Sequence, residues 1–298
     1  MPRTSRSDRA RYAGSRFVGV LIAAGCWLDA RSASAQSDEH ALAPAGPTRA
    51  GHSPLELTVG LRAVHRSFEY HDPALGLDTL LSQKQPLAPA LFAQAFLFPS
   101  AFGSRAALSN LGLAASYELA LPTTAVFDEG AGRETKLTTH ASELFLGFRG
   151  RLPLAAHELG LIAGYGQQRY TNSGDEQTPI VPDVSYEFAR VALDASLRFD
   201  ALTFGARLGT RFVGDTGGLR RDWFPHTKAR ALEAGLLMGY RVAPPFDVVV
   251  GLDLTRYWFD FNPIPKNADP RYVAGGAVDQ YVSGWLGLRI SLENQAPN

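Results

Sequence analysis

The sequence predicts an all-β protein: a closed antiparallel transmembrane β-barrel of about ten strands, with eight or twelve strands as alternatives. Three observations lead to this prediction. Long runs of residues alternate between apolar and polar side chains, the polar positions are rich in glycine, arginine and aspartate, and the connections between runs alternate between long and short. Successive side chains of a strand point to opposite faces of its sheet, so these runs predict strands with one apolar and one polar face.

The clearest alternation covers residues 186–214 and divides at Asp200-Ala201. A two-residue turn there pairs Phe199 with Leu202, and both residues belong to the apolar face, so the register is self-consistent. The opposite face contains Arg, Asp, Ser, Thr and Gly. Repeated glycine packs poorly on a solvated sheet but suits a crowded polar interior. We therefore expect the apolar face to contact lipid and the polar face to line the lumen.

Eight further runs extend the same pattern along the chain, at residues 55–61, 87–98, 110–119, 143–151, 158–168, 232–241, 248–259 and 282–292. The phase of the first run slips near Ala63-Val64, which predicts a β-bulge. Ala243-Pro244-Pro245 predicts a three-residue turn that pairs Val242 with Phe246.

The connections give the expected topology. Long polar segments occupy residues 71–86, 122–141, 171–184, 215–229 and 260–279, and short ones lie at residues 99–106, 153–157, 200–201 and 243–245. Short periplasmic turns and long outer loops are typical of transmembrane barrels. A tilted strand needs about 9–11 residues to cross a bilayer, which the runs supply. An even number of strands returns both termini to the periplasm.

The N-terminal region predicts export. Residues 1–35 combine an arginine-rich leader, an apolar core at Phe17–Leu28 and a small-residue cleavage motif at Ala33-Ser34-Ala35, as in a cleaved signal peptide. A lipoprotein signal acylated at Cys26 is the alternative. We expect residues 36–53 to form a flexible lead-in, residues 54–293 the barrel and residues 294–298 a tail.

Composition excludes several classes of protein. The 298 residues carry equal numbers of basic and acidic side chains, so no nucleic-acid partner is indicated. Beyond the N-terminus no apolar run reaches the roughly 18 residues of a helical membrane span. Cleavage after residue 35 leaves no cysteine, which rules out a disulfide framework. Aromatic residues near the ends of runs suit interfacial girdles. Trp285 falls on the inward face, where it would fill the lumen.

From Leu55 to Leu292 the chain resembles small outer-membrane β-barrel proteins of Gram-negative bacteria. The resemblance is architectural, and no motif identifies a subfamily. It implies localisation in the outer membrane, with outer-membrane lipid and the assembly machinery as partners. Such barrels usually end on an aromatic residue, whereas the last run here ends near Leu292 and residues 293–298 follow. The alternative fold is a soluble, lipocalin-like barrel whose apolar face turns inward.

The inward positions contain many charges. Those predicted to line the lumen are Glu56, Arg62, Glu118, Arg149, Arg190, Asp194, Arg198, Arg207, Arg211, Glu233, Arg241, Asp253 and Arg289. Glu143, Arg151 and Glu158 fall on the same inward face. Buried charges must be paired or hydrated, so the mixed signs predict salt bridges across the lumen. About ten strands enclose far less space than the roughly 16 of an open porin. The sequence therefore predicts a non-catalytic barrel that is structural or forms a narrow pore for small solutes, favouring anions because arginine is in slight excess.

Two alternatives place the function in the outer loops. Ten-stranded outer-membrane barrels include the omptin proteases, so His65, His71-Asp72, His140 and His226 are candidate catalytic residues, as is Ser142 near His140 for a Ser/His hydrolase. A surface adhesin or receptor would use the loops as a binding surface. The sequence predicts no metal and no cofactor, because it contains no phosphate loop, Cys/His zinc pattern or dinucleotide fingerprint.

Overall fold

The computed structural model describes residues 53–71, 83–102, 107–128, 134–174, 183–261 and 274–292. The chain divides into two units, residues 1–44 and 45–298, and all described residues belong to the second. The predicted signal peptide and the C-terminal tail lie outside the described residues, as does the lead-in apart from its last residue.

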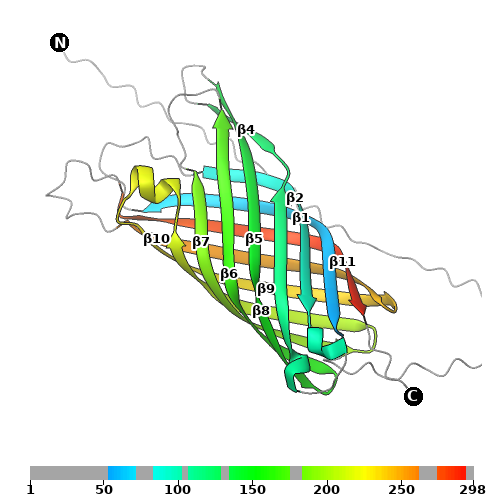
Figure 1. Cartoon of the computed structure of the whole chain (residues 1–298). Helices are drawn as coiled ribbons and strands as arrows, with labels where there is room; N and C mark the ends of the chain where they lie inside the picture. The colour runs from blue at the N-terminus through cyan, green and yellow to red at the C-terminus, as the bar shows by residue number, and fades with distance from the viewer. Residues whose placement is uncertain are drawn as a thin grey trace, which may run out of the picture. The chain divides into compact units, whose positions relative to one another are not determined.

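The described chain forms a closed antiparallel barrel (Figure 1). Its strands are β1 (Leu55–His71), β2 (Gln83–Leu97), β3 (Leu111–Ala120), β4 (Thr123–Asp128), β5 (Glu134–Leu154), β6 (His157–Gly174), β7 (Val184–Phe199), β8 (Leu202–Asp215), β9 (Lys228–Ala243), β10 (Phe246–Asp260) and β11 (Gly276–Leu292). Apart from β3 and β4, neighbours in sequence pair with one another, β1 pairs with β11, and the β3–β5 pairing closes the circle. Because β4 pairs only with the outer part of β5, the closed wall has ten strands, as predicted.

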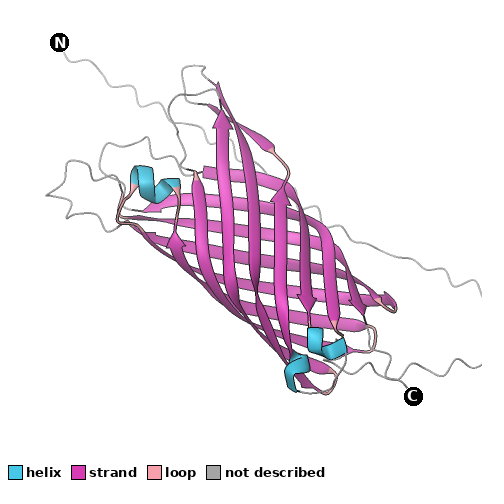
Figure 2. Ribbon diagram, in the orientation of Figure 1, coloured by secondary structure: helices cyan, strands magenta, loops and turns pink. Residues whose placement is uncertain are grey.

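The short connections and the long ones lie at opposite ends of the barrel. Short helical turns η1 (Pro99–Phe102) and η2 (Ala107–Asn110) join β2 to β3 at one end, and η3 (Leu219–Trp223) lies between β8 and β9 at the other (Figure 2). Among the described residues no helix is long and apolar enough to span a bilayer.

The predicted turns are partly confirmed. Phe199 pairs with Leu202 across the turn at residues 200–201. The expected pairing of Val242 with Phe246 is wrong, because Phe246 pairs with Ala243 across the two-residue turn Pro244-Pro245. The register then shifts by one residue between Phe246 and Asp247. The shift restores the alternation, so the apolar side chains of β10 still point outward.

The apolar side chains face outward and the charges face inward. Leu193, Leu208 and Leu252 are 63%, 66% and 62% exposed. Arg198 and Asp253 instead line an internal cavity. A soluble barrel would reverse this arrangement, so the lipocalin-like alternative is wrong. The outward apolar band matches the lipid-facing surface of a transmembrane barrel.

The outward band ends at a defined height on β1, β6, β7, β9, β10 and β11, where polar side chains replace apolar ones. On β9 the outward residue after Leu232 is Arg230, and on β10 the outward residue after Leu254 is Arg256. The other strands repeat the step at His65 on β1, Gln167 on β6, Glu187 on β7 and Gln280 on β11. Because charged side chains on the lipid face are costly at mid-bilayer depth, the step marks the outer edge of the hydrocarbon region.

Beyond this edge the strands continue into segments predicted to be loops. β5 begins at Glu134 and β11 at Gly276, and β4 lies wholly within the expected loop 122–141. β1 shows the reason. It keeps its phase, but above Ala63 its outward residues are polar, and its inward residues other than Arg66 are apolar or aromatic, namely Val64, Phe68 and Tyr70. The expected phase slip is therefore an inversion of polarity, and the bulge lies opposite, where β2 has two residues between the partners of Val64 and Arg66.

Candidate functional site: the charged lumen

A cavity of about 210 Å³ occupies the lumen at the height of the apolar band. Twelve of the thirteen predicted residues lie on its wall, all except Arg241. Seven acidic side chains line it, Glu56, Glu118, Glu143, Glu158, Asp194, Glu233 and Asp253, and seven arginines, Arg62, Arg149, Arg190, Arg198, Arg207, Arg211 and Arg289. Seven minus seven leaves no net charge, so the arginine excess expected from the sequence does not extend to the cavity wall.

The middle of the lumen is organised around Asp253 on β10. Arg62 on β1 donates to Asp253 at 2.9 Å and to Glu118 on β3 at 2.6 Å. Arg207 on β8 donates to the other oxygen of Asp253 at 2.9 Å, and the indole N–H of Trp285 donates at 2.8 Å to the oxygen that Arg62 contacts. Each arginine bridges strands that are not neighbours, so these contacts cross the interior rather than run along the wall. Trp285 points inward, as the alternation predicted.

Nearer the periplasmic end, Arg149 on β5 gathers three carboxylates. It lies 2.7 Å from Glu158, 2.6 Å from Asp194 and 3.6 Å from Glu56. The ring of Phe96 lies 4.3 Å from its guanidinium carbon. Among the described residues, Arg198 is a cavity-lining arginine with no carboxylate within salt-bridge distance.

A third group lies toward the outer end of the cavity. Arg211 on β8 binds both oxygens of Glu143 on β5 at 3.0 Å and also donates to Glu233 at 2.9 Å. Arg190 on β7 donates to the second oxygen of Glu233 at 2.6 Å. Two guanidiniums thus balance two carboxylates, and the group is neutral like the one in the middle of the lumen.

Arg241 lies at the periplasmic end, outside the cavity. There Asp247 accepts hydrogen bonds from Arg289 at 2.7 and 3.0 Å and from Arg241 at 3.2 Å. Arg151 donates to the carbonyls of Ser53 and Ser109, and its guanidinium lies 3.6 Å from the ring centre of Phe98. These contacts narrow the inner end of the lumen.

Inward glycines make room for aromatic rings that lie against the wall. A methyl group at the glycine position would collide with the ring in each of three pairs: Gly112 with Phe98, Gly166 with Phe188, and Gly251 with Trp285. The glycine-rich polar face, which the sequence indicated as a crowded interior, therefore has a specific use. The glycines let the rings pack directly against the backbone, and arginines stack on two of these rings, Arg151 on Phe98 and Arg211 on Phe188.

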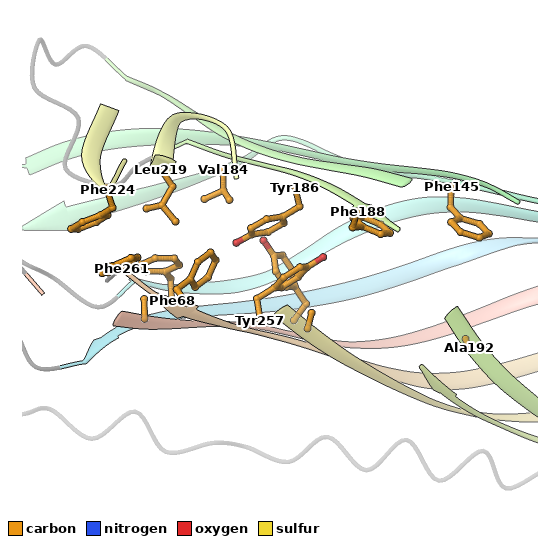
Figure 3. Close-up of a cluster of buried hydrophobic side chains, with 14 of the residues drawn as sticks. Phe68, Phe145, Val184, Tyr186, Phe188, Ala192, Leu219, Phe224, Tyr257 and Phe261 are labelled. Carbon is orange, nitrogen blue, oxygen red and sulfur yellow. The ribbon is translucent and has the colours of Figure 1, made fainter. Parts of the chain in front are cut away.

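An aromatic plug, formed by Phe68, Tyr186, Phe224, Tyr257, Phe259 and Phe261, fills the outer end of the lumen (Figure 3). Phe224 from the β8–β9 connection stacks on Phe261 at 3.8 Å between ring centres. Tyr186 on β7 stacks on Tyr257 on β10 at 4.0 Å. Because two strands separate β7 from β10 in the barrel wall, that contact spans the lumen. The plug lies above the outer edge of the apolar band.

A buried ion pair anchors the plug. Arg66 donates two hydrogen bonds of 2.8 Å to Asp279, which is fully buried. The hydroxyls of Tyr186 and Tyr281 donate to the same carboxylate at 2.5 and 3.0 Å. Tyr170 lies over the Arg66 guanidinium, 3.6 Å from ring centre to guanidinium carbon. The carboxylate is thus bound from three strands, β1, β7 and β11.

Sequence reasoning missed three inward charges, Arg66, Asp247 and Asp279. Asp247 continues the inward alternation of Gly251 and Asp253, so extending that run would have found it. Asp279 ends the polar segment 260–279, which contains Pro263, Pro265 and Pro270 and therefore predicts a loop. Arg66 lies beyond the inversion of polarity on β1, where most inward side chains are apolar. The rule that inward residues are polar therefore does not identify it.

The candidate catalytic residues are not gathered at the outer rim. His140 and Ser142 follow one another on the outward face of β5, and His65 is on the outward face of β1. His71 is exposed at the end of β1 and His226 is exposed in the β8–β9 connection, while Asp72 lies outside the described residues. Within the described residues, no three His, Cys, Asp or Glu side chains are close enough to hold a metal ion.

Comparisons with known proteins concern the fold. No family model and no curated protein matches the chain. Among solved structures, the outer membrane protease OmpT from Escherichia coli is 14% identical, with 83% of this chain and 98% of that one covered and a TM-score of 0.49. The translocator domain of the autotransporter NalP from Neisseria meningitidis is 11% identical, with 80% and 89% covered and a TM-score of 0.44. With its closed ten-stranded wall, outward apolar band and polar lumen, the chain has the fold of a bacterial outer-membrane β-barrel.

Proposed function

We propose that this protein is a non-catalytic, integral outer-membrane barrel that is closed to solutes at rest. The aromatic plug carries the proposal, because its ring contacts cross the lumen between strands that are not neighbours, beyond the outer end of the cavity. Export by the N-terminal signal peptide and insertion by the assembly machinery belong to the same proposal, and the sequence pattern of residues 1–35 supports export.

The ion pairs support a structural role. Arg62, Arg149 and Arg211 each hold carboxylates from two or three different strands. Removing one partner of a buried pair leaves an uncompensated charge, at a cost of about 3–5 kcal/mol. The lumen contacts therefore fix the cross-section of the barrel, and a rigid, filled barrel suits a structural element of the envelope.

Conductance in a planar bilayer tests the closed state. The wild-type protein is expected to give few or no steady channels, whereas the triple variant Phe224→Ala/Phe259→Ala/Phe261→Ala, which removes three of the six plug rings, should conduct. Phe212→Ala is the matched control, because Phe212 is 60% exposed on the outward face and its loss leaves the lumen intact. Stable wild-type channels that the triple variant does not change would contradict the proposal.

A narrow solute path is the second candidate, favoured by the cavity below the plug. If the plugless variant conducts, its ion selectivity is expected to be weak, because seven carboxylates and seven arginines line that cavity. The reversal potential in a potassium chloride gradient should therefore lie near zero. A potential close to the chloride equilibrium value would instead support the anion-selective pore that the sequence suggested.

A further inference from the structure

We infer that Arg230 and Arg256, on the outward face just above the apolar band, bind the phosphorylated headgroup of an outer-leaflet lipid. The acyl chains of this lipid would lie against Phe212, Leu232 and Leu254. The inference rests on the proposed outer-membrane placement, and goes beyond it by assigning a site and a chemical class of ligand.

The register brings the two arginines together. Arg230 pairs with Trp258 across β9 and β10, and Arg256 pairs with Leu232, so the arginines occupy diagonal positions on neighbouring strands. Both point outward and both are exposed. Diagonal neighbours are about 7–8 Å apart at the backbone, within reach of long side chains. Two guanidiniums can therefore contact one phosphate group.

Neither arginine has a carboxylate partner among the described residues, whereas two other charges near this height have polar partners. Lys84 lies 3.8 Å from Glu69, and Glu187 accepts a hydrogen bond from Tyr165 at 2.9 Å. The nearest acid in the register is Asp260, which is diagonal to Arg230 on the same face and directly opposite Lys228. Three basic side chains, Lys228, Arg230 and Arg256, stand against this single acid, and the resulting net positive charge favours an anionic partner.

Trp258 orients one of the two arginines. The Arg256 guanidinium carbon lies 5.4 Å from the centre of the Trp258 ring, within the range of a cation–π contact. Tryptophan is enriched at membrane interfaces, at the level of lipid headgroups. A guanidinium resting on a ring keeps its N–H groups directed to the side, where they can bind phosphate oxygens in pairs.

Continuity with the lipid-facing surface selects a lipid over a free anion. Beside and below the arginines the outward residues Leu232, Leu254 and Phe212 are 52%, 39% and 60% exposed, and Phe212 pairs with Arg230 in the β8–β9 register. A ligand that spans both levels needs a charged headgroup and an apolar tail. A phosphorylated lipid has both, whereas inorganic phosphate has only the first.

The test is native mass spectrometry of the full chain in detergent, titrated with phosphatidic acid or with phosphatidylcholine, whose headgroup carries its own cation. The wild type should retain phosphatidic acid preferentially. Arg230→Gln/Arg256→Gln should weaken that retention about tenfold or more, because a hydrogen bond to a charged group contributes roughly 1.5–3 kcal/mol. Arg169→Gln, an exposed outward arginine on β6, is the matched control and should behave as the wild type.

Inorganic phosphate serves as the competitor. If it displaces the lipid at equal concentration, the site recognises phosphate alone and the lipid assignment is wrong. Equal retention by the wild type and the double variant also overturns the inference. Carbonate extraction of membranes tests the proposed function separately: a wild-type chain that leaves the membrane pellet refutes the barrel's placement, whereas a chain that stays but shows no lipid preference refutes only this site.

Discussion

Replacing Asp279 by alanine is expected to lower the free energy of unfolding by about 3–5 kcal/mol, the cost of leaving one buried charge without its partner. Arg66 would keep a guanidinium buried at 2% exposure, and the hydroxyls of Tyr186 and Tyr281 would lose their shared acceptor. Equilibrium unfolding in denaturant, with the protein folded in phospholipid vesicles and followed by circular dichroism, measures the change.

Two further variants isolate the cause. Glu69→Ala removes an exposed ion pair with Lys84 and should cost less than about 1 kcal/mol. The double variant Arg66→Met/Asp279→Leu replaces the buried pair by apolar side chains and should recover much of the loss, because it leaves no unpaired charge. A loss in Asp279→Ala no larger than that in Glu69→Ala would show that the ion pair does not hold the plug together.

At the outer end of the barrel, the sequence also predicts the two faces of the strands incorrectly. Within the bilayer, one rule assigns both faces: apolar residues contact lipid and polar residues face the lumen. Above the bilayer the outside is water, so the rule inverts. Leu61 points outward and Arg62 inward, but further along the same strand Glu69 points outward and Phe68 inward. Alternation alone predicts where the strands lie. Which face of a strand points into the lumen depends on whether lipid or water surrounds the barrel at that height.

The lumen could be predicted as a set of residues but not as a set of contacts. Parity along each strand places Arg62 and Asp253 inside, and both line the cavity. Their 2.9 Å contact depends on the stagger of β1 relative to β10, with β11 between them. That stagger accumulates over successive strand pairings, so an error of one residue in any pairing moves every partner across the lumen. The bulge on β2 and the shift after Phe246 are such steps.

The second large effect is expected at a pair of facing glycines. Gly164 on β6 pairs directly with Gly147 on β5, and the ring of Phe145 lies over both. A methyl group at Gly164 would overlap the carbonyl oxygen of Leu146 and would lie 2.5 Å from the Gly147 Cα and 2.8 Å from the Phe145 ring. The first two atoms are backbone, so no side-chain rotation relieves the clash. We expect Gly164→Ala to cost about 3 kcal/mol or more, at the upper end of overpacking.

Gly150→Ala on β5 is the matched control for this substitution. A methyl group there would meet only a Leu111 methyl carbon at 3.6 Å, an ordinary contact. Since glycine in a strand is less favourable than alanine by roughly 0.5–1 kcal/mol, Gly150→Ala should be neutral or slightly stabilising. The two variants make the same chemical change on paired strands, so the difference in their unfolding free energies isolates the wall contact at Gly164. Equal unfolding free energies for the two variants would mean that β5 and β6 can separate enough to admit a side chain. The packing of the Phe145 ring would then not depend on glycine at position 164.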